Sequence, residues 1–200
     1  VRVVSSQAKP TGISLAQVLL RDNESTQPGG AIHVEGPGAI HFLVRSLVEK
    51  NSSSAGGGGL AFEGAYFGVL STSFVDNSAS GAGGGMLVTA GEGDITDVAF
   101  ATNTVSGGGQ SHGGGLAIDP EAGDSADVSV NYVGASGNDA GNGDGISARG
   151  DILYAIQWRG SNGARVTEID WRNSRIVRTT THNQGNTQAI EGQYDWINDV

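Results

Sequence analysis

Short alternations of apolar and polar residues recur along the chain between glycine-rich breaks. Five segments share a glycine followed by an apolar residue, with a mostly apolar position two residues further on: 30–33, 59–62, 85–88, 115–118 and 145–148. Alternation with a period of two predicts short β-strands that turn one face to a core and the other outward. The glycines that open these segments are 29, 26, 30 and 30 residues apart.

A second pattern places an apolar residue three positions before an asparagine. It ends at Asn23, Asn51, Asn77 and Asn103, with gaps of 28, 26 and 26 residues, whereas Ala135 stands where we expect the next asparagine. Each repeat therefore holds at least two strands, a turn at the asparagine and a glycine-rich turn. Stacked coils of about 25 to 30 residues bury one continuous core, which a single repeat cannot do.

Stacking gives the asparagines a predicted structural role. Equivalent residues of neighbouring coils lie about 4.8 Å apart, and a side-chain amide is both donor and acceptor. We therefore expect Asn23, Asn51, Asn77 and Asn103 to form a hydrogen-bonded ladder along the stack. Asparagine also tolerates the left-handed backbone conformation that a sharp turn needs.

Two motifs carry a family resemblance. Residues 74–77 and 100–103 read FxxN, and residues 29–32 read GGAI. They resemble repeats of right-handed parallel β-helix proteins, above all the polymorphic-outer-membrane-protein-type repeats of bacterial surface proteins and autotransporter passengers. The resemblance covers about residues 14 to 148. It implies an all-β, right-handed, single-stranded parallel β-helix with three sheets, displayed at the cell surface or outside the cell and often adhesive. Leu20 and Val48 replace phenylalanine in the first two copies, and we expect no membrane-barrel segment after the coils.

We expect a single domain of about six to seven coils over residues 1–200. Residues 1–17 are a candidate N-terminal cap, 18–148 form regular coils, and 149–200 form irregular coils and a C-terminal cap. The last segment holds all three tryptophans and six of the eleven basic residues. Bulky tryptophans beside polar residues suit the closing of an open solenoid core.

The charge is concentrated in the middle of the chain. The formal net charge is −10, and no Lys or Arg occurs between Asn51 and Ala148. Such a surface repels phosphate backbones, so nucleic-acid binding is not expected, whereas it attracts cations and basic surfaces. The lack of cysteine excludes disulfides and cysteine-ligated zinc. No apolar run reaches 18 residues, so we expect no membrane span.

A glycine-rich segment at 137–146 offers candidate calcium ligands, namely Asp139, Asn142 and Asp144. Closely spaced Asp and Asn oxygens on tight turns suit a hard cation. The segment resembles the calcium-binding nonapeptide repeat, but its spacing differs by one and it occurs once. A polar turn without an ion is the alternative.

Five aspartates could meet on adjacent coils: Asp94, Asp97, Asp119, Asp124 and Asp127. Glycoside hydrolysis uses paired carboxylates, and pectin-degrading β-helices place such groups on one sheet. A lyase acting on uronates also needs a cation and a base. His112 is the one candidate base between residues 51 and 148, and we expect it in a solvent-exposed loop.

The C-terminal segment combines aromatic and basic residues that suit carbohydrate or partner contact: Trp158, Arg159, Trp171, Arg172 and Arg175. Indole rings stack on sugars, and guanidinium groups pair with carboxylates. Packing within a cap is the alternative.

The sequence favours a non-enzymatic extracellular or cell-surface domain that displays and binds. Its partner would be a protein or a polysaccharide at a cell surface, contacted by exposed strand positions such as Glu63, Thr89 and Asp119. One alternative is a carbohydrate-active enzyme, either a polysaccharide lyase, a glycoside hydrolase or a tailspike-like depolymerase. Another is a filament subunit that associates end to end through unpaired strand edges. Apart from calcium, the sequence indicates no cofactor.

Overall fold

The computed structural model describes residues 1–4, 12–36, 40–107, 111–120, 126–140 and 145–148, and the backbone of three strands at 152–158, 164–170 and 175–182. Every regular element among these residues is a β-strand. The chain divides into two units, Val1–Ser147 and Ala148–Val200.

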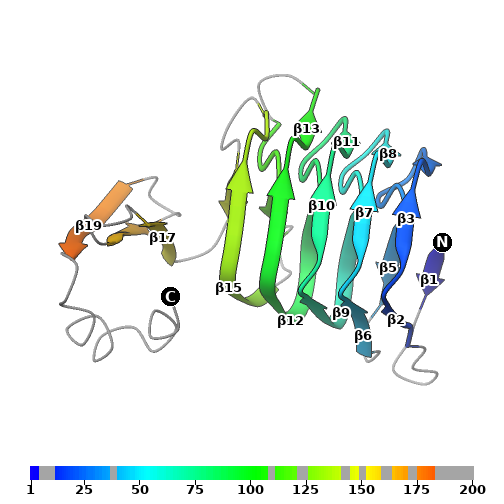
Figure 1. Ribbon diagram of the computed structural model, residues 1–200, viewed down its shortest axis with the longest axis horizontal. Helices are drawn as coiled ribbons and strands as arrows, with labels where there is room; N and C mark the ends of the chain where they lie inside the picture. The colour runs from blue at the N-terminus through cyan, green and yellow to red at the C-terminus, as the bar shows by residue number, and fades with distance from the viewer. Residues whose placement is uncertain are drawn as a thin grey trace. The chain divides into compact units, whose positions relative to one another are not determined.

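The first unit is a stack of coils whose strands pair in parallel with the equivalent strands of neighbouring coils (Figure 1). The first face contains β1 (Arg2–Val4), β5 (Ile32–Glu35), the first residues of β9 (Leu60–Leu70) and β12 (Met86–Ala101), β14 (Leu116–Ile118) and β16 (Ile146–Ala148). The second face contains β2 (Ser14–Ala16), β6 (Ile40–Val44), the remainder of β9, the middle of β12 and the start of β15 (Ala126–Ser136). The third face contains β3 (Leu19–Arg21), β7 (Leu47–Glu49), β10 (Ser73–Val75) and the ends of β12 and β15. A short sheet of two-residue strands lies beyond the third face: β4 (Glu24–Ser25), β8 (Ser52–Ser53), β11 (Ser78–Ala79) and β13 (Thr104–Val105).

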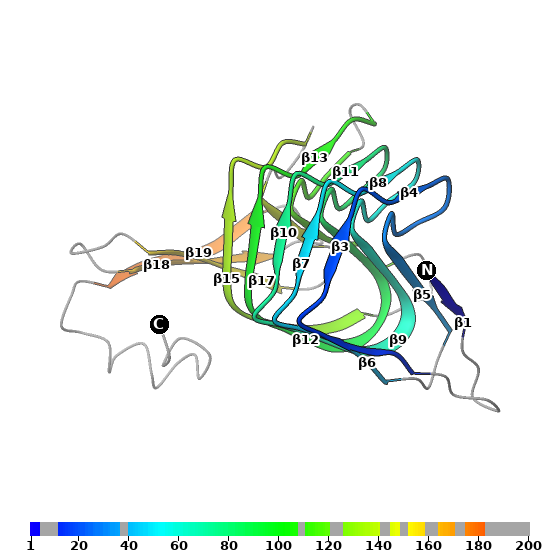
Figure 2. The same ribbon diagram turned by 45° about the vertical axis from the view of Figure 1, so that its right-hand side comes forward.

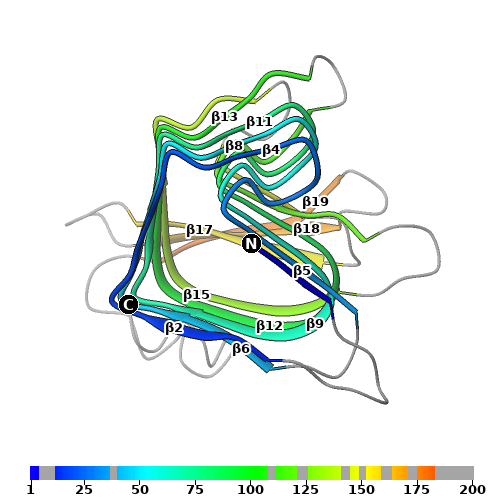
Figure 3. The same cartoon turned by 90° about the vertical axis from the view of Figure 1, so that its right-hand side faces the viewer.

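Viewed along the stack, the coils close around a common core (Figure 3). The turned view in Figure 2 shows the strands of successive coils following one another in order. The predicted all-β parallel solenoid is confirmed. The predicted number of six to seven coils is too high, since the described residues form about four turns, counted from Asn23 to Asn138.

The core consists of columns of apolar side chains that stack from coil to coil. Val48, Phe74 and Phe100 occupy one register position on the third face and are at most 1% exposed. The rings of Phe74 and Phe100 stack with centroids 4.9 Å apart. Such stacking buries large areas at the positions where the FxxN pattern places phenylalanine.

The asparagine ladder runs through the turn after the third face. Each ladder asparagine donates its backbone N–H and its side-chain amide to Oδ1 of the next, from Asn23 through Asn51 and Asn77 to Asn103. Asn103 donates in the same way to Asn138. The expectation of a missing asparagine at Ala135 is therefore wrong. Ala135 pairs with Phe100, so it occupies the apolar position of the motif, and the asparagine follows three residues later.

The residue before each ladder asparagine, rather than the asparagine itself, adopts the left-handed conformation. Its φ is positive at Asp22, Lys50, Asp76 and Thr102. A second corner, between the second and third faces, repeats this conformation in a column of unrelated residue types: Gln17, Arg45, Ser71, Asp97 and Tyr132. Coil geometry thus imposes a conformation that residue preference does not signal.

The first face is buried on both sides, contrary to the predicted alternation. Met86 and Val88 point into the core, and Leu87 between them is only 7% exposed. Outside the solenoid, Leu87 packs with Ala61, Ala117 and Ala82 in a small second cluster. The glycine-rich turns permit this close covering: a Cβ on Gly56 would lie 2.4 Å from the Leu87 side chain. Glu63, Thr89 and Asp119, expected to be exposed on this face, are partly buried.

The glycine alignment also shifts by one residue in the first repeat. Ile32 pairs with Leu60, so Ala31, rather than Gly30, corresponds to Gly59. The later segments pair as predicted, with Leu60, Met86 and Leu116 in one column.

The second unit contains β17 (Ile152–Trp158), β18 (Ala164–Asp170) and β19 (Arg175–His182). They form a three-stranded sheet in which both pairings are antiparallel. Strands of successive solenoid coils pair in parallel, so the irregular coils predicted within 149–200 are not formed by these three strands. A capping role for this segment stays a prediction.

Candidate functional site

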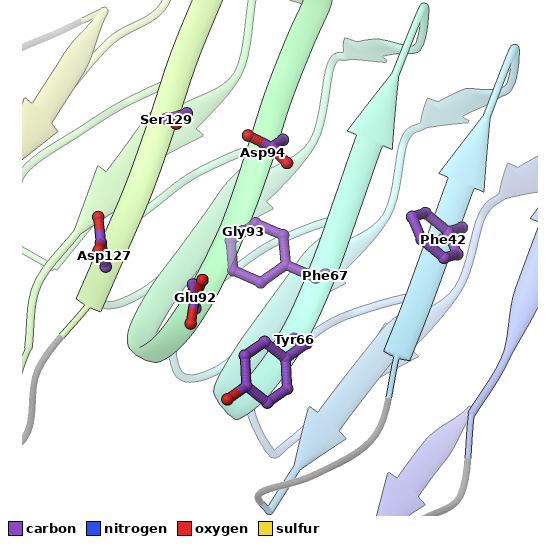
Figure 4. Close-up of a pocket in the computed structure, with 8 residues that line it drawn as sticks. All are labelled: Phe42, Tyr66, Phe67, Glu92, Gly93, Asp94, Asp127 and Ser129. Atoms are coloured by element: carbon purple, nitrogen blue, oxygen red, sulfur yellow. The ribbon is translucent and has the colours of Figure 1, made fainter.

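A groove of about 520 Å³ lies on the outer side of the second face. Figure 4 shows that its lining comes from four successive strands, β6, β9, β12 and β15: Phe42, Tyr66, Phe67, Glu92, Gly93, Asp94, Asp127 and Ser129. Side chains two apart on a strand share a face, and paired residues of adjacent strands are neighbours. Tyr66, Glu92 and Asp127 therefore form one row, and Phe42, Asp94 and Ser129 lie in the next.

One half of the groove is aromatic. Tyr66 is 49% exposed and Phe42 is 43% exposed. Phe42 lies over Gly68 of the next coil, because a Cβ there would come within 2.8 Å of the Phe42 ring. Exposed rings of this size on a strand face are available for stacking with a ligand.

The other half is acidic. Glu92 and Asp127 pair directly in register on neighbouring coils, and Asp94 follows Glu92 on the same side of β12. All three are exposed. No Lys or Arg occurs from Asn51 to Ala148, so this half of the groove presents acceptors and negative charge to a ligand.

The five predicted aspartates do not form one cluster. Asp94 and Asp127 share the groove, whereas Asp97 occupies the left-handed corner after it. Asp119 lies on a different face, and Asp124 is outside the described residues. Sequence reasoning omitted Glu92 from this set, although its position two residues before Asp94 in a strand places both on one side.

Three histidines of the first unit are buried. His112, expected in a solvent-exposed loop, is only 9% exposed, and its Nε2 lies 3.0 Å from Oδ2 of Asp119. His41 points into the core, in register with Phe67, and its Nδ1 accepts a hydrogen bond from the Ile13 N–H. Burial lowers the pKa of His41. His33 lies on the outer side of the first face and contacts Glu63.

A salt bridge joins Arg2 of β1 to Glu35 of β5, next to His33. The hydrogen bond from Arg2 lowers the pKa of the Glu35 carboxyl. The same hydrogen bond raises the pKa of the Arg2 guanidinium.

The predicted calcium ligands are only partly described. Asp139 is exposed, and its backbone pairs with the Asn103 turn of the preceding coil. Asn142 and Asp144 lie outside the described residues, so the calcium site stays a prediction. The same holds for the carbohydrate contacts in the second unit. Trp158 lies on β17 and Arg175 on β19, whereas Arg159, Trp171 and Arg172 are outside the described residues.

Comparison with protein-family models, with curated proteins and with solved structures found no match. Among the described residues, no helix has the length and apolarity needed to cross a membrane.

Proposed function

We propose that this chain is a non-enzymatic binding domain, displayed at a cell surface or outside the cell, whose groove holds a neutral or amino-bearing sugar chain. The proposal rests on one observation, namely that exposed aromatic rings and carboxylates line the same groove. Rings stack on the apolar faces of sugars, and carboxylates accept hydrogen bonds from hydroxyl and ammonium groups. The resemblance of the repeats to polymorphic-outer-membrane-protein-type repeats supports display.

Charge narrows the ligand class. Glu92, Asp94 and Asp127 would repel a uronate polymer, and no basic residue lines the groove in the described part of the chain. Ammonium groups of an amino sugar would instead meet complementary charge. The lining residues lie on strands rather than on loops, and the asparagine ladder links the coils that contain these strands. Residues held on regular elements favour a preformed site.

Calorimetric titration of the full chain with three oligosaccharide classes tests this proposal: chitosan oligosaccharides, neutral cello-oligosaccharides and oligogalacturonates. We expect binding of at least one of the first two classes and none of the third. Tyr66→Ala should weaken binding by about 2- to 12-fold, because an aromatic stacking contact is worth about 0.5–1.5 kcal/mol. Tyr132→Ala is the matched control, since Tyr132 is 40% exposed but does not line the groove. Failure of all three classes to bind, or equal loss in both variants, would reject the proposal.

A glycoside hydrolase is the second candidate, favoured by the carboxylates on neighbouring coils. Glu92 and Asp127 are paired residues on adjacent strands, about 4.8 Å apart, and Glu92 and Asp94 are separated by about 6.6 Å along the strand. These are backbone spacings, and side chains carried at them can bring their carboxyl groups to the separations used by paired catalytic carboxyl groups. Release of reducing ends by the wild-type chain, abolished by Glu92→Gln or Asp127→Asn, would replace the binding proposal with an enzymatic one.

A further inference from the structure

Outside the groove, one histidine and two glutamates converge on the outer side of the first face. His33 and Glu35 are two residues apart on β5, so their side chains share one side of the strand. Glu63 of β9 is the direct register partner of Glu35. One ligand atom from each of the three residues lies within 4.8 Å of the other two.

His33 is only 6% exposed, yet its imidazole lacks the hydrogen bonds that a buried polar side chain normally makes. Neither of its ring nitrogens makes a hydrogen bond within the structure. Its Nε2 nevertheless lies 3.2 Å from Oε1 of Glu63. A buried polar group without a hydrogen bond is costly, so this nitrogen is expected to have a partner. The distance between Nε2 and Oε1 suits a metal ion as this partner, because two ligand atoms that each lie about 2.05 Å from a tetrahedral zinc ion are about 3.3 Å apart.

The two glutamates give a second reason. Like charges placed directly opposite each other on paired strands repel. Arg2 compensates part of this charge by pairing with Glu35 from β1. Glu63 contacts His33, which offsets its charge only when the imidazole is protonated. A divalent cation between the three groups would neutralise both carboxylates and use the neutral imidazole as a ligand.

We propose that His33, Glu35 and Glu63 form a binding site for a divalent transition-metal ion such as Zn²⁺. Imidazole nitrogen together with carboxylate oxygen selects this class of ion over calcium, which takes oxygen ligands. Three protein ligands leave one position for water. Arg2 competes with the ion for Glu35, so loading the site requires its guanidinium to release that carboxylate. The side chain of Arg2 is 62% exposed and can turn into solvent.

Calorimetric titration of the metal-free full chain with Zn²⁺ tests the site, with Co²⁺ absorption as a report on coordination. We expect one equivalent to bind. His33→Ala and Glu63→Gln should each weaken binding by at least about tenfold, since even outer-shell partners of a metal site are worth about 10- to 100-fold. Arg2→Gln should strengthen binding several-fold by removing a competing cation, an effect that a folding defect cannot produce.

His112→Ala is the matched control, because His112 also contacts a carboxylate but belongs to no group of three potential ligands among the described residues. This variant should bind Zn²⁺ like the wild type. Circular dichroism of each variant checks that the coils are intact. The proposal is overturned if the wild type does not bind Zn²⁺, if His33→Ala and Glu63→Gln leave binding unchanged, or if His112→Ala weakens it as much as His33→Ala.

Discussion

Removal of one interior asparagine tests the energetic role of the ladder. Asn77 is completely buried, and its side chain makes four hydrogen bonds. Its amide donates to the Val48 carbonyl and to Oδ1 of Asn103, each at 2.9 Å. Its Oδ1 accepts from the backbone N–H and the side-chain amide of Asn51, at 3.0 and 2.9 Å.

In Asn77→Ala all four bonds are lost, and the buried Asn51 N–H loses its acceptor. At about 0.5–1.5 kcal/mol net for each hydrogen bond, the free energy of unfolding should fall by about 2–6 kcal/mol. Asn23→Ala is the matched control, because Asn23 is exposed at the end of the ladder and water can replace its bonds. The loss there should be below about 1 kcal/mol.

Urea unfolding followed by circular dichroism measures both variants, with the slope compared to detect any loss of two-state behaviour. A loss for Asn77→Ala that equals the loss for Asn23→Ala would show that the buried ladder adds no stability beyond that of an exposed turn. The reasoning would then be refuted.

Three further predictions concern the same framework. Asn138→Ala removes three hydrogen bonds to Asn103 and Phe100 and should cost about 1.5–4.5 kcal/mol in the same urea assay; a neutral result would place Asn138 outside the ladder. Gly84→Ala should cost about 1–3 kcal/mol or more in thermal unfolding, because its Cβ would lie 2.3 Å from the Gly114 carbonyl oxygen, whereas Gly134→Ala, with open space at its Cβ, should be neutral. Burial lowers the folded-state pKa of His41. Above the unfolded-state pKa of about 6.5 this histidine is neutral in both states and the fold keeps its full stability. As the pH falls below that value, the unfolded chain binds a proton at this histidine more readily than the folded chain, so the free energy of unfolding decreases. Between pH 7 and pH 5, the midpoint of urea unfolding should therefore fall less for His41→Phe than for the wild type. An identical fall would contradict the assignment of this pH dependence to His41.

The coil architecture was predictable because its signals are local and repeated. An apolar residue three positions before an asparagine specifies an inward side chain and a turn, and four copies fix the period. The fifth copy was missed for two reasons. The step from Asn103 to Asn138 is 35 residues rather than 26, and Ala135 replaces the phenylalanine that marks the motif.

The groove depends on which strands become neighbours and on their register, so only part of it was foreseen. Asp94 and Asp127 were among the aspartates that could meet on adjacent coils. The aromatic half was not foreseen, because Tyr66 and Phe42 come from coils one and two repeats before the coil of Asp94. The burial of Leu87 was missed since a strand pattern does not reveal that a glycine-rich turn will cover its outer side. Irregular coils were predicted within 149–200, but β17, β18 and β19 pair in antiparallel fashion, and pairing direction depends on the partner strand as well as on the strand's own sequence.

Amide chemical-shift mapping locates a bound oligosaccharide on the protein and therefore tests whether the groove is the binding site. The full chain is titrated with the chitosan or cello-oligosaccharide that binds in calorimetry, and the shifts are followed residue by residue. We expect changes centred on Tyr66, Glu92, Asp94 and Asp127 across three adjacent strands. Changes centred on the strands at 152–182, or no changes at saturating ligand, would contradict it.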